Sequence, residues 1–273
     1  MPHFMCVTCG TQFAATEQPP EHCPICEDER QYIGHDGQQW TTLEALQTSH
    51  HNVVRPHEPN LLGIGTQPKF AIGQRALLVQ TPRGNVLWDC ISLIDDETVA
   101  AVRAAGGIDA IAISHPHYYS SMVEWSRAFD NAPIYLHAAD RQWVMRPDDA
   151  VVFWEGETHP LMDGLTLIRG GGHFAGGAML HWPAGAEGRG ALLSGDIIQV
   201  VQDRRYVSFM RSYPNLIPLP PSAVQHIVDS VAPFRFDRIY GAWWDTIVAT
   251  DAEAAVRRSA ERYIRMITGD LPD

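Results

Sequence analysis

Basic side chains are scarce in this sequence of 273 residues. Lysine and arginine together number 20, against 32 aspartate and glutamate residues, so the formal net charge at pH 7 is −12. A chain with this balance lacks the basic surface that neutralises phosphate groups, which argues against a nucleic-acid partner. It also contains no run of lysine and arginine that would hold an anionic membrane surface. The excess of acidic residues mainly predicts solubility.

Long apolar runs are absent as well. No stretch approaches the length of about 18 apolar residues that a membrane-spanning helix needs. The first ten residues, MPHFMCVTCG, contain no basic segment followed by an apolar one, so we expect no secretory signal peptide. Hydrophobic residues still make up 45% of the chain, enough for one large domain or for one domain with a small module. We therefore expect a cytoplasmic protein that acts on a small-molecule substrate.

Cysteine is rare too, and its placement is uneven. Four of the five cysteines lie in two C-x-x-C pairs, Cys6 with Cys9 and Cys23 with Cys26, and the fifth is Cys90. Disulfides are rare in cytosolic proteins, and no βαβ pattern surrounds the pairs as it would in a thioredoxin-like redox motif. Four thiolates suit tetrahedral Zn²⁺, or iron as in rubredoxin-like sites. The two pairs therefore predict one four-cysteine metal site.

The segment around these pairs resembles a zinc-ribbon or rubredoxin-like module, which we place at residues 1–36. A segment this short has too few apolar residues to fold alone, so a bound ion, zinc or alternatively iron, would supply much of its stability. Modules of this kind more often serve as structural or docking elements than as catalysts. The sequence therefore allows docking of a protein partner through the module, and it leaves assembly into a homo-oligomer open.

The remainder of the chain alternates between strand and helix patterns. Residues 27–69 are polar and irregular, apart from a short helix expected over residues 41–46. From residue 70 onward, apolar runs predict strands and amphipathic runs predict helices. The expected strands cover residues 76–81, 86–90, 108–113, 134–136, 151–153, 165–168, 178–182, 191–194 and 238–240. The expected helices cover residues 95–105, 120–129, 140–145, 222–231 and 251–267.

Metal-ligand residue types recur where predicted strands end. An apolar run leads directly into His115 and His117, whose imidazoles point the same way if the segment is extended. Two further strands lead into glycine-rich loops that present His173 and Asp196, and glycine there lets the backbone approach a metal centre closely. Three imidazoles and one carboxylate suit a zinc- or iron-type ion. We predict one zinc or iron ion held by these four residues.

These motifs, taken in order, resemble the metallo-β-lactamase superfamily over about residues 65–273. The resemblance rests on the strand end Trp88-Asp89-Cys90, on residues 114–117, on Gly171-Gly172-His173 and on Ser194-Gly195-Asp196. It implies an αββα sandwich with the metal site at one edge between two sheets, and metal-activated water as the usual chemistry. The expected fold is therefore α/β, with the four-cysteine module followed by a metallo-β-lactamase-like domain over residues 37–273.

The chain departs from the family pattern at each ligand that belongs only to a second metal. Tyr119 and Ser120 stand where the pattern H-x-H-x-D-H has its aspartate and last histidine. The segment Gly241-Ala242-Trp243-Trp244 offers no histidine where the family has one after a strand. The resemblance therefore implies a mononuclear site in which Tyr119, Ser120 and Trp243 fill the vacated volume.

The same resemblance suggests roles for other side chains. Asp89 would orient a ligand histidine from behind, and Asp196, usually a bridging ligand, would take part in catalysis. The Tyr119 hydroxyl could donate to a developing oxyanion or leaving group, with simple cavity filling as the alternative. Trp243 and Trp244 would line or close an apolar or aromatic pocket. His137 is a weaker pocket candidate, for which a structural role is the alternative.

Three functions remain open at this point. The first is a mononuclear metallo-hydrolase that attacks an ester, thioester or phosphoester with metal-activated water, although four protein ligands leave little room for water in a tetrahedral site. The second is a mononuclear-iron oxidoreductase that receives electrons through the four-cysteine module. The third is a non-catalytic metal-binding or regulatory protein.

Overall fold

The computed structural model describes residues 1–270, and the last three residues of the predicted 37–273 domain lie outside the described part. The chain divides into two compact units, Met1–Trp154 and Glu155–Asp273. Each unit contains one large β-sheet with helices, as the α/β assignment predicted. The boundary expected between residues 36 and 37 stays a prediction, because the four-cysteine segment lies within the first unit.

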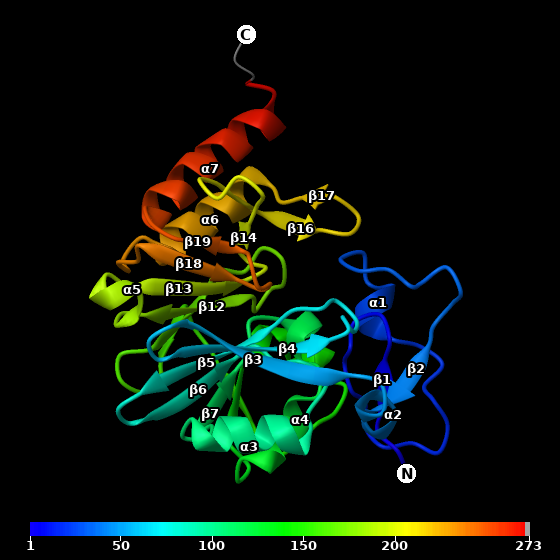
Figure 1. Ribbon diagram of the computed structural model, residues 1–273. Helices are drawn as coiled ribbons and strands as arrows, with labels where there is room; N and C mark the ends of the chain where they lie inside the picture. Colours follow the sequence, from blue (N-terminus) through cyan, green and yellow to red (C-terminus); the bar gives the residue numbers. More distant parts are fainter. Residues whose placement is uncertain (271–273) are drawn as a thin grey trace. The chain divides into compact units, whose positions relative to one another are not determined.

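The first unit is built on a seven-stranded sheet whose strands follow one another in chain order. The antiparallel part comprises β3 (His51–Glu58), β4 (Leu61–Gln67), β5 (Ala76–Thr81) and β6 (Gly84–Trp88). Three strands then continue it in parallel: β7 (Ala110–Ala112), β8 (Ile134–His137) and β9 (Val151–Trp154). The helices α3 (Asp96–Ala104) and α4 (Met122–Ala128) lie along one face of this sheet (Figure 1).

The expectation of an irregular chain over residues 27–69 was wrong. Residues 51–67 form the β3–β4 hairpin, and β3 is one of the two edge strands of the sheet. All eight residues of β3 are half-buried or exposed, so the strand lacks the apolar run that marks buried strands. Pro56 is tolerated because an edge strand leaves one row of N–H groups unused, and a bulge lies between Pro56 and Glu58.

The four-cysteine segment contains short elements that extend beyond residue 36. They are β1 (Phe4–Cys6), α1 (Pro24–Glu27), β2 (Trp40–Thr42) and α2 (Leu43–Gln47). Strand β1 pairs with β2, so Phe4 lies opposite Thr42. The cysteines pack with Phe13 and Ile25, and Ile72, Trp143 and Met145 from later in the first unit pack against this cluster. The segment therefore takes part of its core from the rest of its unit.

The second unit is built on a six-stranded sheet. In spatial order its strands are β10 (Thr158–Pro160), β11 (Thr166–Arg169), β12 (Ala178–Trp182), β13 (Ala191–Gly195), β18 (Arg238–Gly241) and β19 (Ile247–Val248). Only β13 and β18 pair in parallel. The helices α6 (Pro221–Val231) and α7 (Ala252–Thr268) cover one face of the sheet (Figure 1) and join its apolar core.

Several shorter elements complete the two units. The first unit has the 3₁₀ turns η1 (Pro116–Tyr118) and η2 (Ala138–Trp143). The second has α5 (Gly185–Gly188) and the strand pairs β14 (Gln199–Val200) with β15 (Val207–Ser208) and β16 (Met210–Ser212) with β17 (Ile217–Pro218).

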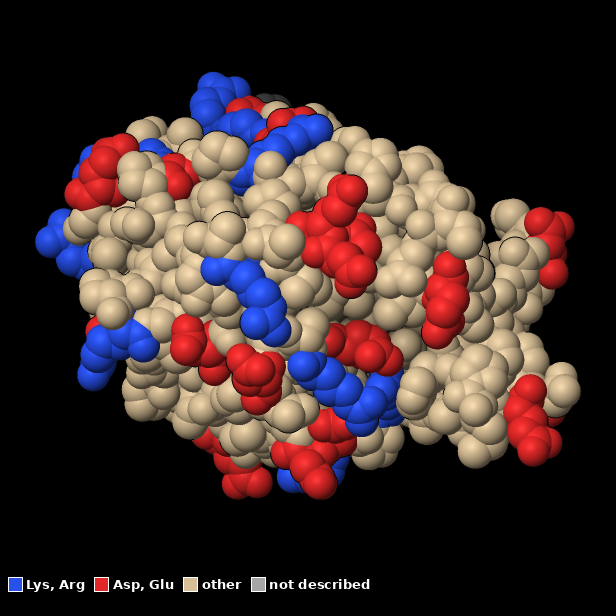
Figure 2. Space-filling view, turned by 60° about the horizontal axis from the view of Figure 1, so that its bottom comes forward, with Lys and Arg blue, Asp and Glu red and all other residues tan. Residues whose placement is uncertain are grey.

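The surface carries charges of both signs. Figure 2 shows acidic and basic side chains interspersed on the face that it presents. Within residues 1–270, no helix is both long enough and apolar enough to cross a membrane.

Candidate metal centres

The four N-terminal cysteines form a compact sulfur cluster. Cys6 Sγ lies 3.5 Å from Cys26 Sγ, and Cys9 Sγ lies 3.8 Å from Cys23 Sγ. Four sulfurs placed about 2.3 Å from a zinc ion are about 3.8 Å apart along the edges of the tetrahedron, whereas disulfide sulfurs are about 2.05 Å apart. All four side chains are buried and none forms a disulfide. The spacing therefore fits a tetrahedral metal site.

Backbone and side-chain donors support the sulfur cluster. The N–H of Gly10 donates to the carbonyl of Cys6 at 2.8 Å, and Gly10 has a φ of +80°. A Cβ at this position would lie 2.4 Å from Ser92 Oγ, so glycine is required for both conformation and space. Gln38 Nε2 donates to Cys6 Sγ at 3.2 Å. Hydrogen bonds from Cys23 and the other two thiols lower the pKa of Cys6, which favours a thiolate in the cluster.

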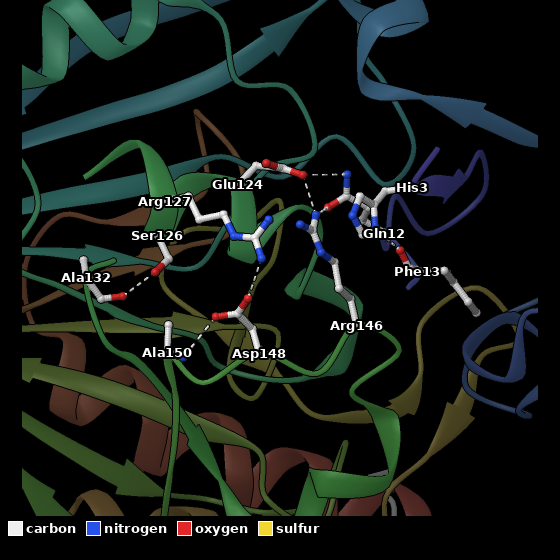
Figure 3. A network of polar contacts seen from close by, with 10 residues as sticks. All are labelled: His3, Gln12, Phe13, Glu124, Ser126, Arg127, Ala132, Arg146, Asp148 and Ala150. Atoms are coloured by element: carbon white, nitrogen blue, oxygen red, sulfur yellow. Dashed lines mark hydrogen bonds and ion pairs between the residues drawn. The ribbon is translucent and has the colours of Figure 1, made fainter. Parts of the chain in front are cut away.

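A polar contact fixes the segment that follows Cys9 to the rest of the first unit. The guanidinium of Arg146 donates to the side-chain oxygen of Gln12 and to Glu124 on α4 (Figure 3). Gln12 Nε2 also lies 3.4 Å from Glu124 Oε1. The backbone N–H of Gln12 donates to the carbonyl of Ser120 at 3.0 Å. This contact therefore ties the four-cysteine segment to the stretch just after His115 and His117.

The first two candidate ligands, His115 and His117, lie shortly after the end of β7. Asp89 Oδ1 accepts a hydrogen bond from the N–H of Ser114 at 2.8 Å, and Ser114 Oγ lies 2.8 Å from His115 Nδ1. His115 is extended, but His117 lies within the 3₁₀ turn η1 rather than on an extended segment as expected. Pro116 begins this turn because its fixed φ suits a first helical position. Asp89 is therefore linked to His115 through Ser114, and the Ser114 contact leaves His115 Nε2 as the nitrogen that could bind a metal.

The second pair of ligands comes from two loops of the second unit. His173 Nδ1 donates to the carbonyl of Arg211 at 2.8 Å, so its Nε2 carries the lone pair that can bind a metal. Asp196 follows Gly195, whose register partner in the parallel strand β18 is Gly241. Both ligand side chains are buried.

The residues within 1–270 contain two groups of ligand-type side chains whose donor atoms lie within 4.8 Å of one another. One is the four-cysteine cluster, and the other comprises His115, His117, His173 and Asp196. Each of these side chains is buried, and three imidazoles with one carboxylate are a donor set that zinc and iron favour. The predicted residues therefore fit a metal ion.

Tyr119 and Ser120 lie directly after the histidine pair. Ser120 Oγ donates to the carbonyl of Cys90 at 3.3 Å and accepts from Gln74 Nε2 at 3.1 Å, so this hydroxyl takes part in holding the loop. Tyr119 is buried, and burial together with the charge of Asp140 raises the pKa of its phenol well above the usual value. Tyr119 therefore keeps its proton at neutral pH.

The remaining three pocket candidates, His137, Trp243 and Trp244, differ in their surroundings. His137 Nδ1 accepts from the N–H of Ala139 at 3.1 Å and caps η2, while its ring packs edge-on against Trp154. This contact is the structural role considered as the alternative. Trp243 and Trp244 are half-buried and line a hollow of the second unit.

Tyr213 is a residue of this site that the sequence did not indicate. Its hydroxyl donates to the backbone carbonyl of Asp196 at 2.8 Å, and its ring centroid lies 5.7 Å from that of His173. It lies in the β16–β17 turn, seventeen positions after Asp196. A proline-rich loop gives no pattern from which such a contact could be predicted.

We compared the chain with family models, with curated proteins and with solved structures. No family model matches it. A curated protein of Bacillus subtilis (strain 168), "Uncharacterized protein YmaE", is 52% identical over 273 residues, and the match covers 99% of each chain.

The solved structures are much more distant in sequence. VMB-1 has a TM-score of 0.59 at 11% identity, and the match covers 80% of this chain and 98% of that chain. The DIM-1 metallo-β-lactamase has a TM-score of 0.58 at 12% identity, with the same coverage. The metallo-β-lactamase SMB-1, in complex with mercaptoacetic acid, has a TM-score of 0.51 at 16% identity, covering 76% of this chain and 94% of that chain. The predicted metallo-β-lactamase fold is confirmed, and the chain belongs to the same protein family as YmaE.

Proposed function

We propose that the protein is a hydrolase that depends on one metal ion held by His115, His117, His173 and Asp196. Its substrate would be a small molecule with an ester, thioester or phosphoester bond. The observation that carries the proposal is the buried set of three imidazoles and one carboxylate in a chain with the metallo-β-lactamase fold. A metal ion bound there would make water nucleophilic at neutral pH and would polarise a substrate oxygen.

The chain's own residues would prepare this chemistry by fixing the ligands. Ser114 Oγ and the Arg211 carbonyl each engage the Nδ1 of one ligand histidine, which directs the Nε2 atoms toward the ion. A loosely held Asp196 carboxylate would leave room for water in the site and would take the proton that the attacking water releases. Because the ligand side chains are buried, bulk water is excluded and the charges interact more strongly.

Tyr119 is the proposed hydrogen-bond donor to the oxyanion or to the leaving group. Its raised pKa keeps the phenol protonated, as a donor requires. Tyr119 also lines a small cavity with Thr11 and Gln12, an arrangement that equally suits cavity filling. Tyr119→Phe separates the two roles, since loss of a donor lowers kcat about 10²-fold or more with little change in Tm. An unchanged kcat would contradict a catalytic role for this hydroxyl.

A single metal in the pocket is supported by what replaces the second-metal ligands. Ser120 contacts Cys90 and Gln74 through its hydroxyl. Trp243 lies in a turn, in which its backbone N–H donates to Thr246 Oγ1 at 3.0 Å. Neither side chain is of a type that binds zinc or iron well. We therefore propose one ion in the pocket and a second, structural ion in the four-cysteine cluster.

Element analysis of protein purified without added metal tests this proposal. We expect about two ions per chain, one of which is lost in His115→Ala while Cys9→Ser loses the other. Zinc in the pocket with hydrolysis of ester or phosphoester substrates would support the hydrolase. Iron in the pocket with O₂-dependent turnover would instead support the oxidoreductase. An unchanged metal content in His115→Ala would refute the pocket assignment.

A further inference from the structure

The second unit contains a hollow of about 730 Å³, a size within the range of small-molecule sites. Its wall comes from β14, from the loop after β14 and from the turn after β18. The side chains that matter for binding are Gln199, Arg204, Trp243, Trp244 and Asp245. The sequence predicted that Trp243 and Trp244 line or close an apolar or aromatic pocket, and it indicated no ligand for Gln199 or Arg204.

Sheet register places this hollow at the same strand ends as Asp196. Gly195 and Gly241 are register partners in the parallel strands β13 and β18, so the residues after them leave the sheet at one edge. Asp196 is the next residue in one strand, and Trp243 follows two positions after Gly241 in the other. Gln199 begins β14 three positions after Asp196. A molecule in the hollow would therefore lie along the same edge as the proposed metal ligand.

Arg204 supplies the cationic group of the hollow. Its guanidinium is half-buried and donates to the backbone carbonyl of Val201, and no carboxylate among residues 1–270 forms an ion pair with it. Neighbouring arginines differ in this respect, since Arg205 pairs with Asp203 and Arg258 pairs with Asp251. A half-buried guanidinium with donors to spare suits a carboxylate, which it can bind with two parallel hydrogen bonds.

The other walls define the rest of the ligand. The two indole rings of Trp243 and Trp244 are half-buried and offer flat apolar surfaces to an aromatic body. Gln199 Oε1 is buried and accepts no hydrogen bond from any residue in the described part of the chain. Asp245 is exposed and contributes a negative charge to the lining of the hollow. A second negative group on the ligand would be repelled there.

We propose that this hollow binds a monocarboxylate with a flat apolar body, its carboxylate on Arg204 and its body against Trp243 and Trp244. Binding of such a carboxylate requires only the hollow. Its role as the non-reacting part of a substrate rests on the proposed function, because it would be remote from the bond that is cleaved. The proposed substrate class then narrows to an ester, thioester or phosphoester whose non-reacting part carries a carboxylate on a flat apolar body.

Titration of the purified holoprotein with 2-naphthoate and with its neutral counterpart 2-naphthamide tests the binding, with calorimetry as the readout. We expect the carboxylate to bind at least about tenfold more tightly than the amide. Arg204→Gln should abolish this preference, whereas Arg205→Gln should leave it unchanged, because Arg205 already pairs with Asp203. Trp244→Ala should weaken both ligands, and Asp245→Asn should favour the carboxylate further. Equal affinities in the wild type, or a preference that survives Arg204→Gln, would overturn the proposal.

The same titration on His115→Ala separates the hollow from the metal pocket. If Arg204 holds the carboxylate, the preference for naphthoate persists when the pocket ion is lost. Should the preference disappear with the ion, the carboxylate binds the metal and the hollow is not its site. Failure of hydrolase activity with a persistent Arg204-dependent preference would refute the proposed function alone.

Discussion

Replacing Arg146 with methionine should destabilise the first unit strongly. The Arg146 side chain is 5% exposed and its ion-pair partner Glu124 is 25% exposed. Removing one partner of a fully buried pair costs about 3–5 kcal/mol, because the other charge stays buried without compensation. Since a quarter of Glu124 reaches solvent, we expect about 2–3 kcal/mol for Arg146→Met. For a unit of this size, that corresponds to a fall in Tm of about 5–10 °C.

Calorimetric or circular-dichroism melting measures this change, and Arg127→Met is a matched control. Arg127 pairs with Asp148 at 2.9 Å but is 53% exposed, so its loss should cost less than about 1 kcal/mol (Figure 3). The double variant Glu124→Gln with Arg146→Met should lose less than the sum of the single variants, because the stranded charge is gone. Equal melting of Arg146→Met and Arg127→Met, or strictly additive losses in the double variant, would refute this reasoning.

Three further substitutions test other parts of the molecule. Ser114→Ala removes the partner of His115 Nδ1 and should weaken pocket metal affinity about 10–100-fold in a chelator competition, and an unchanged affinity would contradict the orienting role. Burial lowers the pKa of His181 below 6.5 in the folded chain. As the pH falls below 6.5, the unfolded chain therefore binds a proton at His181 more readily than the folded chain, which lowers the free energy of unfolding. The urea midpoint should therefore fall between pH 7 and about pH 5.5, and His181→Gln should flatten this dependence; parallel curves for both proteins would contradict it. Gly190 has a φ of +88°, and a Cβ there would lie 2.0 Å from the carbonyl oxygen of Arg235, so Gly190→Ala should lower the Tm by several degrees, whereas an unchanged Tm would argue against this contact.

The two groups of ligand-type side chains could be predicted because their signal is local. His115, His117, His173 and Asp196 each follow an apolar strand within a few positions, and the C-x-x-C pairs are defined by their own spacing. The positions of strands could also be predicted from the sequence wherever a strand is buried on both faces, as in β12 and β13. Periodicity and residue type were sufficient in those places.

The features that could not be predicted depend on contacts between distant segments. Tyr213 reaches the carbonyl of Asp196 across seventeen positions, and Arg146 meets Gln12 across a separation of 134. The 3₁₀ turn at His117 arises from a single proline, and the same residue type in β3 made a genuine edge strand resemble a loop. Side-chain partners of this kind depend on the packed chain, and one sequence does not reveal them.

The contacts of the four-cysteine segment run forward along the chain, and this has a consequence for biosynthesis. The last of the four cysteines is residue 26, but the hydrogen-bond partners of this segment include Ser120 and Arg146. During synthesis the thiols therefore leave the ribosome well before the residues that enclose them, and we expect the metal site to close late. A ribosome-bound chain arrested before residue 120 should yield its bound metal to a chelator faster than the released full-length chain. Equal release from both would show that the cysteine cluster closes without its later partners.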